Sequence, residues 1–218
     1  EILKDIALRI GPEDDEILRQ VAMTAMTGKG AEDAKEKFAD IIVKAVRQIE
    51  DNGRIDLADI KIEKLKGEGI KDTELISGIV LSSERISFDM PEKINNAKIA
   101  LVDFPLELKN PEIETKVSIS SPEQLQNFIN QEEKMIKDMV EKIKISGANA
   151  VFCQKGIDDF ARYLLSKENI YACRRVGRED MEKISKATGG KIISNLDELV
   201  SARLGNAQVV KEVKHGDE

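Results

Sequence analysis

The C-terminal half of the chain alternates short apolar runs with amphipathic segments, and this alternation constrains the fold more than any other feature. Runs typical of buried strands occur at Ala150–Gln154, Tyr171–Arg174 and Lys191–Ser194. Segments with helical periodicity, Ile157–Lys167 and Arg178–Thr188, lie between them. The order strand, helix, strand implies parallel strands joined by right-handed crossovers. We therefore predict an α/β fold, with a layered sheet domain flanked by helices.

Further strands are predicted elsewhere from alternating or continuous apolar runs. These are Ile60–Leu65, Leu75–Leu81, Lys98–Asp103, Val117–Ser120 and Gln208–Val213. Two long helices are predicted upstream, at Glu13–Met26 and Ala31–Glu50, and Asp51–Gly53 ends the second with turn residues. The Gly67–Gly69 run is a linker candidate. We therefore expect a helical segment over residues 1–67, a sheet domain over 68–215 and a tail at 216–218.

The stretch from Ser118 to Ile145 contains two helix-start signals in tandem. Ser121 with Gln124, and Asn130 with Glu133, both match a capping box, and Pro122 suits a first helical position. This pattern predicts a short helix at Pro122–Ile129, a break at Asn130 and a longer helix at Gln131–Ile145.

The apolar residues of these two helices are candidate binding residues. They are Leu125, Phe128 and Ile129 on the short helix, and Met135 and Ile136 on the longer one. Exposed apolar clusters usually mark an interaction site. The alternative is that the first three fold back onto Met135 and Ile136 and close a small local core.

Composition narrows the classes of function. The 218 residues carry a net charge of −7 with a pI near 5.1, which argues against a nucleic-acid surface. No apolar run approaches the roughly 20 residues of a membrane span, and no signal peptide is expected. Cys153 and Cys173 are far apart and lack CxxC spacing. We therefore expect reduced core cysteines and a cytoplasmic location.

The search for catalytic and metal-binding sets finds almost nothing. His215 is the only histidine and lies near the end of the given sequence, so it suits neither a triad nor a metal site. Without a cluster of His, Cys, Asp and Glu, a transition-metal site is not expected. The carboxylates are spread along predicted helix faces, so no catalytic pair is expected either.

One loop has the chemistry of an anion site. Lys29 stands between Gly28 and Gly30, just before the second predicted helix. Free N–H groups and the helix dipole favour an anion at a helix N-terminus, and a flexible lysine there could reach a phosphate. The loop is not a P-loop, because the four-residue spacer and the hydroxyl after the lysine are missing. From the residues alone, an ordinary interhelical turn remains the alternative.

Several long runs resemble one family. SPEQLQNFINQEEKMIKDMVEKI, GANAVFCQKGIDDFARYLL and CRRVGREDMEKISKATGGKIISN strongly resemble the group II chaperonins, the archaeal thermosome in particular. VAMTAMTGKGAE and DTELISGIVLSSERISFDMPEKINNAKIALVDFPLE resemble them equally well. A subunit of that family has equatorial, intermediate and apical domains. The resemblance implies that residues 1–67 are the first half of an intermediate domain, followed by an apical domain with a helical protrusion at about 117–145.

The resemblance also implies a function. The parent protein would be an ATP-driven folding machine that uses Mg²⁺, binds unfolded client proteins and assembles with sister subunits in a double ring. The family's Gly-Asp-Gly-Thr-Thr nucleotide loop and its general-base Asp have no counterpart in this chain. We therefore expect unfolded-protein binding and lid formation here, with no catalytic residue, no cofactor and no enzymatic activity of its own.

Three sites follow from the resemblance. Lys29, with Gly28 and Gly30, falls on the family's nucleotide-sensing loop. The tandem helices match the protrusion that forms a built-in lid. Helix Ile157–Lys167 falls on the part of the apical domain that holds client chains, which makes Phe160, Tyr163 and Leu164 candidate client contacts.

Two other classes of function remain open from the residues. An α/β small-molecule-binding enzyme would place its site at the carboxyl ends of the strands, in the turn Gln154–Gly156. A plain protein-interaction domain would form no ring. The lack of an acid or base near that turn weighs against the enzyme.

Overall fold

The computed structural model describes the chain except for residues 1, 8–9, 12, 65–68, 108–121 and 214–218. The chain divides into two compact units, Glu1–Val80 together with Lys214–Glu218, and Leu81–Val213. The division lies after Val80, whereas the sequence suggested a domain boundary near Gly67. The predicted strand Val117–Ser120 and His215 lie outside the described residues.

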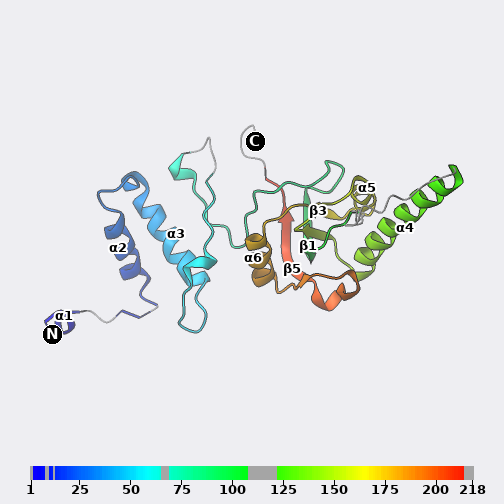
Figure 1. The fold of residues 1–218 in the computed structure, drawn as a ribbon. Helices are drawn as coiled ribbons and strands as arrows, with labels where there is room; N and C mark the ends of the chain where they lie inside the picture. Colours follow the sequence, from blue (N-terminus) through cyan, green and yellow to red (C-terminus); the bar gives the residue numbers. More distant parts are fainter. Residues whose placement is uncertain (1, 8–9, 12, 65–68, 108–121, 214–218) are drawn as a thin grey trace, which may run out of the picture. The chain divides into compact units, whose positions relative to one another are not determined.

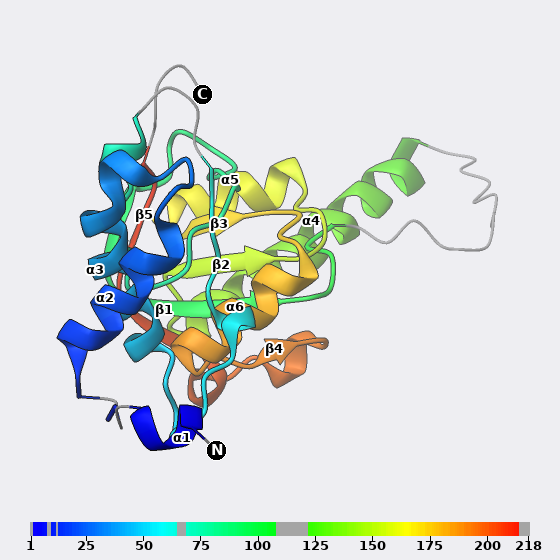
Figure 2. The ribbon, with the colours of Figure 1, turned by 90° about the vertical axis from the view of Figure 1, so that its left-hand side faces the viewer.

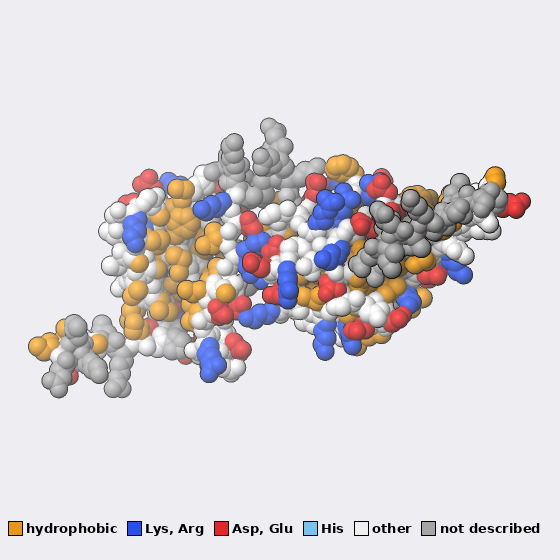
Figure 3. Space-filling view, in the orientation of Figure 1, with side chains coloured by type: hydrophobic (Ala, Val, Ile, Leu, Met, Phe, Trp, Pro, Cys, Tyr) orange, Lys and Arg blue, Asp and Glu red, His pale blue; other side chains and the backbone are white. Residues whose placement is uncertain are grey.

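The first unit is built around two packed helices, α2 (Asp15–Met26) and α3 (Lys35–Gln48). Shorter helical elements accompany them: α1 (Ile2–Ile6), η1 (Glu32–Ala34), η2 (Leu57–Asp59) and η3 (Ile70–Asp72). Two ion pairs join α2 to α3: Arg19–Asp40 at 2.7 Å and Arg47–Asp15 at 2.6 Å. Apolar side chains such as Val21 and Ile42 stay exposed along these helices, where Figure 3 shows a hydrophobic band.

The turn after α3 forms as predicted. Asp51 and Arg54 exchange two backbone hydrogen bonds of 2.9 and 3.0 Å. Asn52 and Gly53 between them have φ values of 52° and 77°. Two successive left-handed residues define the tight two-residue turn that Asn-Gly favours.

The predicted strands Ile60–Leu65 and Leu75–Leu81 are wrong over their described residues, which form no ladder. Ile60 ends η2 by donating its N–H to Leu57, and Gly78 donates to Ile76 within a bend. Alternating apolar residues indicate a surface that could pack in a sheet, but a strand needs a partner strand to pair with. Neither segment pairs with one.

The second unit is an α/β domain around a five-stranded sheet (Figures 1 and 2). Strand order is β3-β2-β1-β4, and β5 pairs antiparallel with β1. The strands are β1 (Lys93–Val102), β2 (Ala150–Cys153), β3 (Tyr171–Cys173), β4 (Ile192–Ile193) and β5 (Gly205–Lys211). The helices are α4 (Pro122–Ser146), α5 (Asp159–Lys167) and α6 (Arg178–Thr188). Short turns η4 (Leu196–Glu198) and η5 (Ser201–Arg203) precede β5.

The sheet separates two helical layers. Alternate residues of a strand face opposite sides. Ala100 and Val102 of β1 lie in one buried cluster with Ile143 of α4 and Leu165 of α5. Because α6 packs against β1, β4 and β5, the other face, which includes buried Leu101, is covered as well. The predicted parallel alternation is confirmed: β2 and β4 both run parallel to β1, and β3 runs parallel to β2.

Strand β1 begins five residues earlier than predicted, at Lys93 instead of Lys98. Its first half pairs with β5, from Lys93 opposite Lys211 to Ala97 opposite Ala207. Asn95 and Asn96 hid this extension, because asparagine is depleted in strands. Asn96 has φ 52°, yet the pairing register is the same on both sides of it, with Asn95 opposite Val209 and Ala97 opposite Ala207.

The predicted break at Asn130 is wrong, since α4 runs without interruption from Pro122 to Ser146. The Asn130 side chain accepts a hydrogen bond of 3.1 Å from Nε2 of Gln126, one turn earlier on the same helix. A second capping-box pattern inside a helix resembles a helix start in sequence, but no glycine or proline stands there to end the preceding turn. The predicted short helix at Pro122–Ile129 is therefore not a separate element but the first part of α4.

Substitution of Asn130 distinguishes an interior position from a cap. We expect Asn130→Ala to leave α4 as stable or more so. Alanine gains up to about 0.7 kcal/mol in helix propensity, against the lost Gln126 pair of about 0.2–0.5 kcal/mol. At an N-cap the same change would cost about 1 kcal/mol. Amide hydrogen exchange over α4 measures the difference, and faster exchange from Gln131 onward would contradict the continuous helix.

Candidate functional site

The N-terminal half of α4 extends beyond the body of its domain (Figure 1). Ile136, Val140 and Ile143 are buried in the core, with exposed fractions of 4% or less. Between Pro122 and Met135, no residue whose side chain is described is buried. Since a helix rises 1.5 Å per residue, this free half is about 21 Å long.

The free half of α4 carries exposed apolar side chains. Phe128 is 41% exposed, Ile129 39% and Met135 53%. Ile136, also predicted as a binding residue, is 2% exposed and belongs to the core cluster, so it holds the helix in place and is not on this surface. The side chain of Leu125 lies outside what the structure describes. Phe128 and Ile129 are thus not closed into a local core with Ile136.

Helix α5 packs against α4 and contributes a second part of the site. Tyr163 is 52% exposed, whereas Phe160 and Leu164 are half-buried and pack against the core cluster. Nζ of Lys137 on α4 lies 5.3 Å from the centre of the Phe160 ring, a cation–π distance that joins the two helices. Of the three predicted client contacts, Tyr163 is therefore the most accessible.

The base of α4 is fastened by charge as well as by burial. Nζ of Lys144 lies 2.9 Å from Oε1 of Glu168, just beyond α5, and this hydrogen bond raises the pKa of Lys144. Lys142 forms an ion pair with Asp197 in η4. An open depression on this side of α4 is lined by apolar Met135, Met139 and Leu196 and by charged Asp138, Glu141 and Lys142. The arrangement gives a helix that is anchored at its base and whose described side chains near the tip are exposed.

The loop that carries Lys29 lies between α2 and η1. Gly28, with φ 73°, donates its N–H to Oε2 of Glu32 at 2.8 Å. The other oxygen of Glu32 lies 2.9 Å from Nζ of Lys35, and this bond, followed by the one from Gly28, lowers the pKa of Glu32. The carboxylate of Glu32 thus already occupies a backbone donor that an external anion would need. The Lys29 side chain is exposed and forms no ion pair with a described residue, so its role stays a prediction.

The turn predicted for a rival enzyme site is filled by a side chain. A Cβ added at Gly156 would clash with the Glu107 carboxylate, which occupies the space above the carboxyl end of β2. The expectation that no acid or base lies near this turn is therefore wrong. Within the described part of the chain, no group of three or more His, Cys, Asp or Glu residues could hold a metal ion. Each described helix is too short or too polar to cross a bilayer.

Sequence reasoning missed the residues that fix the site. Lys137, Lys144 and Glu168 join α4 to α5, yet charged residues on a helix are read as solvated by default. Only the i to i+7 spacing from Lys137 to Lys144 could have placed the two lysines on one side of the helix.

Comparison with known proteins identifies close relatives. The model of the TCP-1/cpn60 chaperonin family matches residues 1–218. A thermosome subunit of Methanothermococcus thermolithotrophicus is 52% identical over 215 residues, which are 98% of this chain and 40% of that protein. The thermosome subunit beta of Archaeoglobus fulgidus is 53% identical over 222 residues, covering 100% of this chain and 41% of the relative. The chain therefore spans about two fifths of the length of these relatives.

The fold matches a solved structure of the same kind. The open-state monomer of a group II chaperonin from Methanococcoides burtonii superposes with a TM-score of 0.75 at 42% sequence identity. The match covers 98% of this chain and 48% of that one.

Labelling of the two buried cysteines tests the expectation that neither is a reactive nucleophile. Burial raises the pKa of Cys153 and of Cys173 to about 11. At pH 7 to 8, well below these pKa values, both thiols are protonated and shielded. We expect a thiol reagent such as DTNB to label neither cysteine in the folded protein and both after unfolding. Rapid labelling of either one under native conditions would show an accessible thiolate.

Proposed function

The chain belongs to the TCP-1/cpn60 chaperonin family, and from this premise we propose that it binds unfolded protein and forms part of a built-in lid. The exposed apolar residues on the free half of α4 are the observation that carries the proposal. Helix α5, with Tyr163 exposed beside it, would supply the second contact. This role agrees with the protein-folding function of the family.

The energetics suit reversible capture. Fully burying one large apolar side chain contributes about 1.5–3 kcal/mol. Phe128, Ile129 and Met135 are already about half covered, so each offers roughly half of that amount to a client. Several weak, non-directional contacts hold apolar segments of many sequences without selecting one, and they release a client once its own core forms.

In the full-length protein we propose the family's arrangement. Residues 1–67 would be the first half of an intermediate domain, and 68–215 an apical domain whose protrusion spans about 117–145. The protein would act with sister subunits in a double ring in the cytoplasm, on unfolded clients, driven by ATP and Mg²⁺.

The present chain would hydrolyse no ATP and require no cofactor, since it contains no Gly-Asp-Gly-Thr-Thr run. Lys29, flanked by Gly28 and Gly30, would sense the nucleotide held by another domain. The exposed, unpaired state of the Lys29 side chain among the described residues supports this role.

Removal of the apolar tip tests the proposal. We expect the triple variant Phe128→Ser, Ile129→Ser and Met135→Ser to keep its melting temperature, because none of the three side chains is buried. Capture of a chemically denatured client, measured as suppression of its aggregation, should fall severalfold. Undiminished capture would contradict the proposal.

Ile145 supplies the matched control. It lies on the same helix and is 75% exposed, but at the anchored end. Ile145→Ser makes the same chemical change away from the tip and should leave capture unchanged. Equal loss in both variants would show that general surface hydrophobicity, and not the free half of α4, binds clients.

A further inference from the structure

Arg85 is the one charged residue among the described residues that is buried, with 8% exposure. It belongs to the segment Leu81–Glu92, which leads into β1 without forming a helix or a strand. Ile86 in this segment donates its N–H to the carbonyl of Ala172 in β3 at 3.0 Å. The thiol of Cys173 donates to the carbonyl of Glu84 at 3.2 Å. The segment therefore lies along the β3 edge of the sheet.

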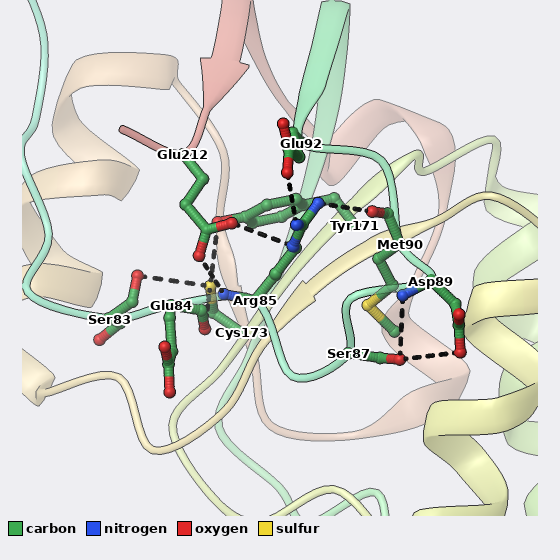
Figure 4. A network of polar contacts seen from close by, with 10 residues as sticks. All are labelled: Ser83, Glu84, Arg85, Ser87, Asp89, Met90, Glu92, Tyr171, Cys173 and Glu212. Atoms are coloured by element: carbon green, nitrogen blue, oxygen red, sulfur yellow. Dashed lines mark hydrogen bonds and ion pairs between the residues drawn. The ribbon is translucent and has the colours of Figure 1, made fainter. Parts of the chain in front are cut away.

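The guanidinium of Arg85 makes polar contacts with three groups (Figure 4) and also lies 5.7 Å from the centre of the Phe88 ring. Nη1 donates to the carbonyl of Met90 at 2.8 Å, and Nη2 lies 2.7 Å from Oε1 of Glu92. Nε lies 3.0 Å from Oε2 of Glu212, although its N–H does not point at that oxygen, so this contact is one of charge and not a hydrogen bond. The backbone N–H of Arg85 also donates to Oε1 of Glu212, at 3.4 Å. Glu212 thus holds both the backbone and the side chain of Arg85.

An ion pair that is largely buried, as Arg85–Glu212 is, is poor evidence of a purely stabilising role. Withdrawing two charges from water is costly, and an apolar pair of similar volume often gives equal or greater stability. What the pair adds is geometry, because a buried guanidinium is tolerated only where its partners are in place. The question is therefore which parts of the chain Arg85 holds together.

Arg85 and Glu212 lie close to the two points, called crossings below, at which the chain enters and leaves the sheet domain. The chain enters the domain at Leu81 and leaves it after Val213. Arg85 follows the first crossing by four residues, and Glu212 precedes the second by one. Glu212 also donates its N–H to the carbonyl of Glu92 at 2.9 Å, next to β1. The ion pair of buried Arg85 with partly buried Glu212 therefore joins the incoming and outgoing segments.

We propose that Arg85 and Glu212 form a latch that fastens these two crossings to each other, so that the sheet domain moves as one rigid body when the rest of the protein changes conformation. A displacement that enters the domain through either crossing then moves α4 by the full amount, because none of it is lost in deformation within the domain. Without the latch the incoming segment, which has no ladder of its own, separates from Glu212 just after β5 and absorbs part of the motion. The inference rests on the proposed function only where the motion is the ATP-driven closure of a lid.

Amide hydrogen exchange in the full-length protein tests the latch directly. In Arg85→Met, which keeps an apolar stem, exchange at the amides of residues 86 and 212 should become about tenfold faster or more, through local opening. In Glu212→Gln, which removes the opposing charge, exchange at Ile86 should become faster to the same extent. Exchange at Val151 in the centre of the sheet should not change. Arg203→Met, which breaks the exposed Arg203–Glu198 pair, is the matched control and should alter neither amide.

A second readout measures the consequence for motion. With ATP, protection of α4 from protease should be lost in Arg85→Met but kept in Arg203→Met, while capture of a denatured client without ATP should stay normal in both. If Arg85→Met fails to fold, Arg85→Lys, which keeps the charge and loses the fork of contacts, should show the same faster exchange. Unchanged exchange at Glu212 in the folded variants would overturn the latch. If the wild-type protein does not capture a denatured client, the proposed function is overturned. The hydrogen-exchange result would still decide whether the latch exists.

Discussion

The packing of the C-terminal half of α4 against the sheet is the contact on which the rest of the structure depends. Ile136, Val140 and Ile143 enter the same cluster as Val151 and Cys153 of β2, all with exposed fractions of 4% or less. This burial fixes the direction of the helix, so the free half needs no contacts of its own to stay extended. Lys144 and Glu168 hold the base to α5 from the outside. A site with a rigid base and an exposed apolar tip follows from that division of one helix into two halves.

Much of the sheet domain could be predicted from the sequence, because its elements combine strong patterns with clear ends. Helix α6 has the predicted bounds, Arg178–Thr188, and Gly189 ends it with φ 72°. The strands β2 and β3 begin where their apolar runs begin. The apolar pattern failed to predict strands where the presence of a neighbouring strand decides whether a segment joins the sheet. The alternating run at residues 60–64 forms no β-ladder with another described segment, whereas polar Asn95 and Asn96 belong to β1 because β5 lies beside them.

The candidate site was harder to predict than the fold. A helix-start pattern at Asn130 cannot be told from a helix interior by local sequence, because the difference lies in whether the preceding turn continues. Ile136 has the same apolar character as Met135, yet only the packing of α4 places one in the core and the other on the surface. The Arg85–Glu212 pair joins residues 127 positions apart, so no local pattern could reveal it.

Site-specific photocrosslinking tests most directly whether the free half of α4 is the client-binding surface. A photoreactive residue in place of Phe128 is compared with one in place of Glu182, an exposed residue of α6 on the other layer of the domain. With a chemically denatured client, the account predicts crosslinks from position 128 and few from position 182, and none from either with the client in its native state. Equal yields from the two positions would contradict it.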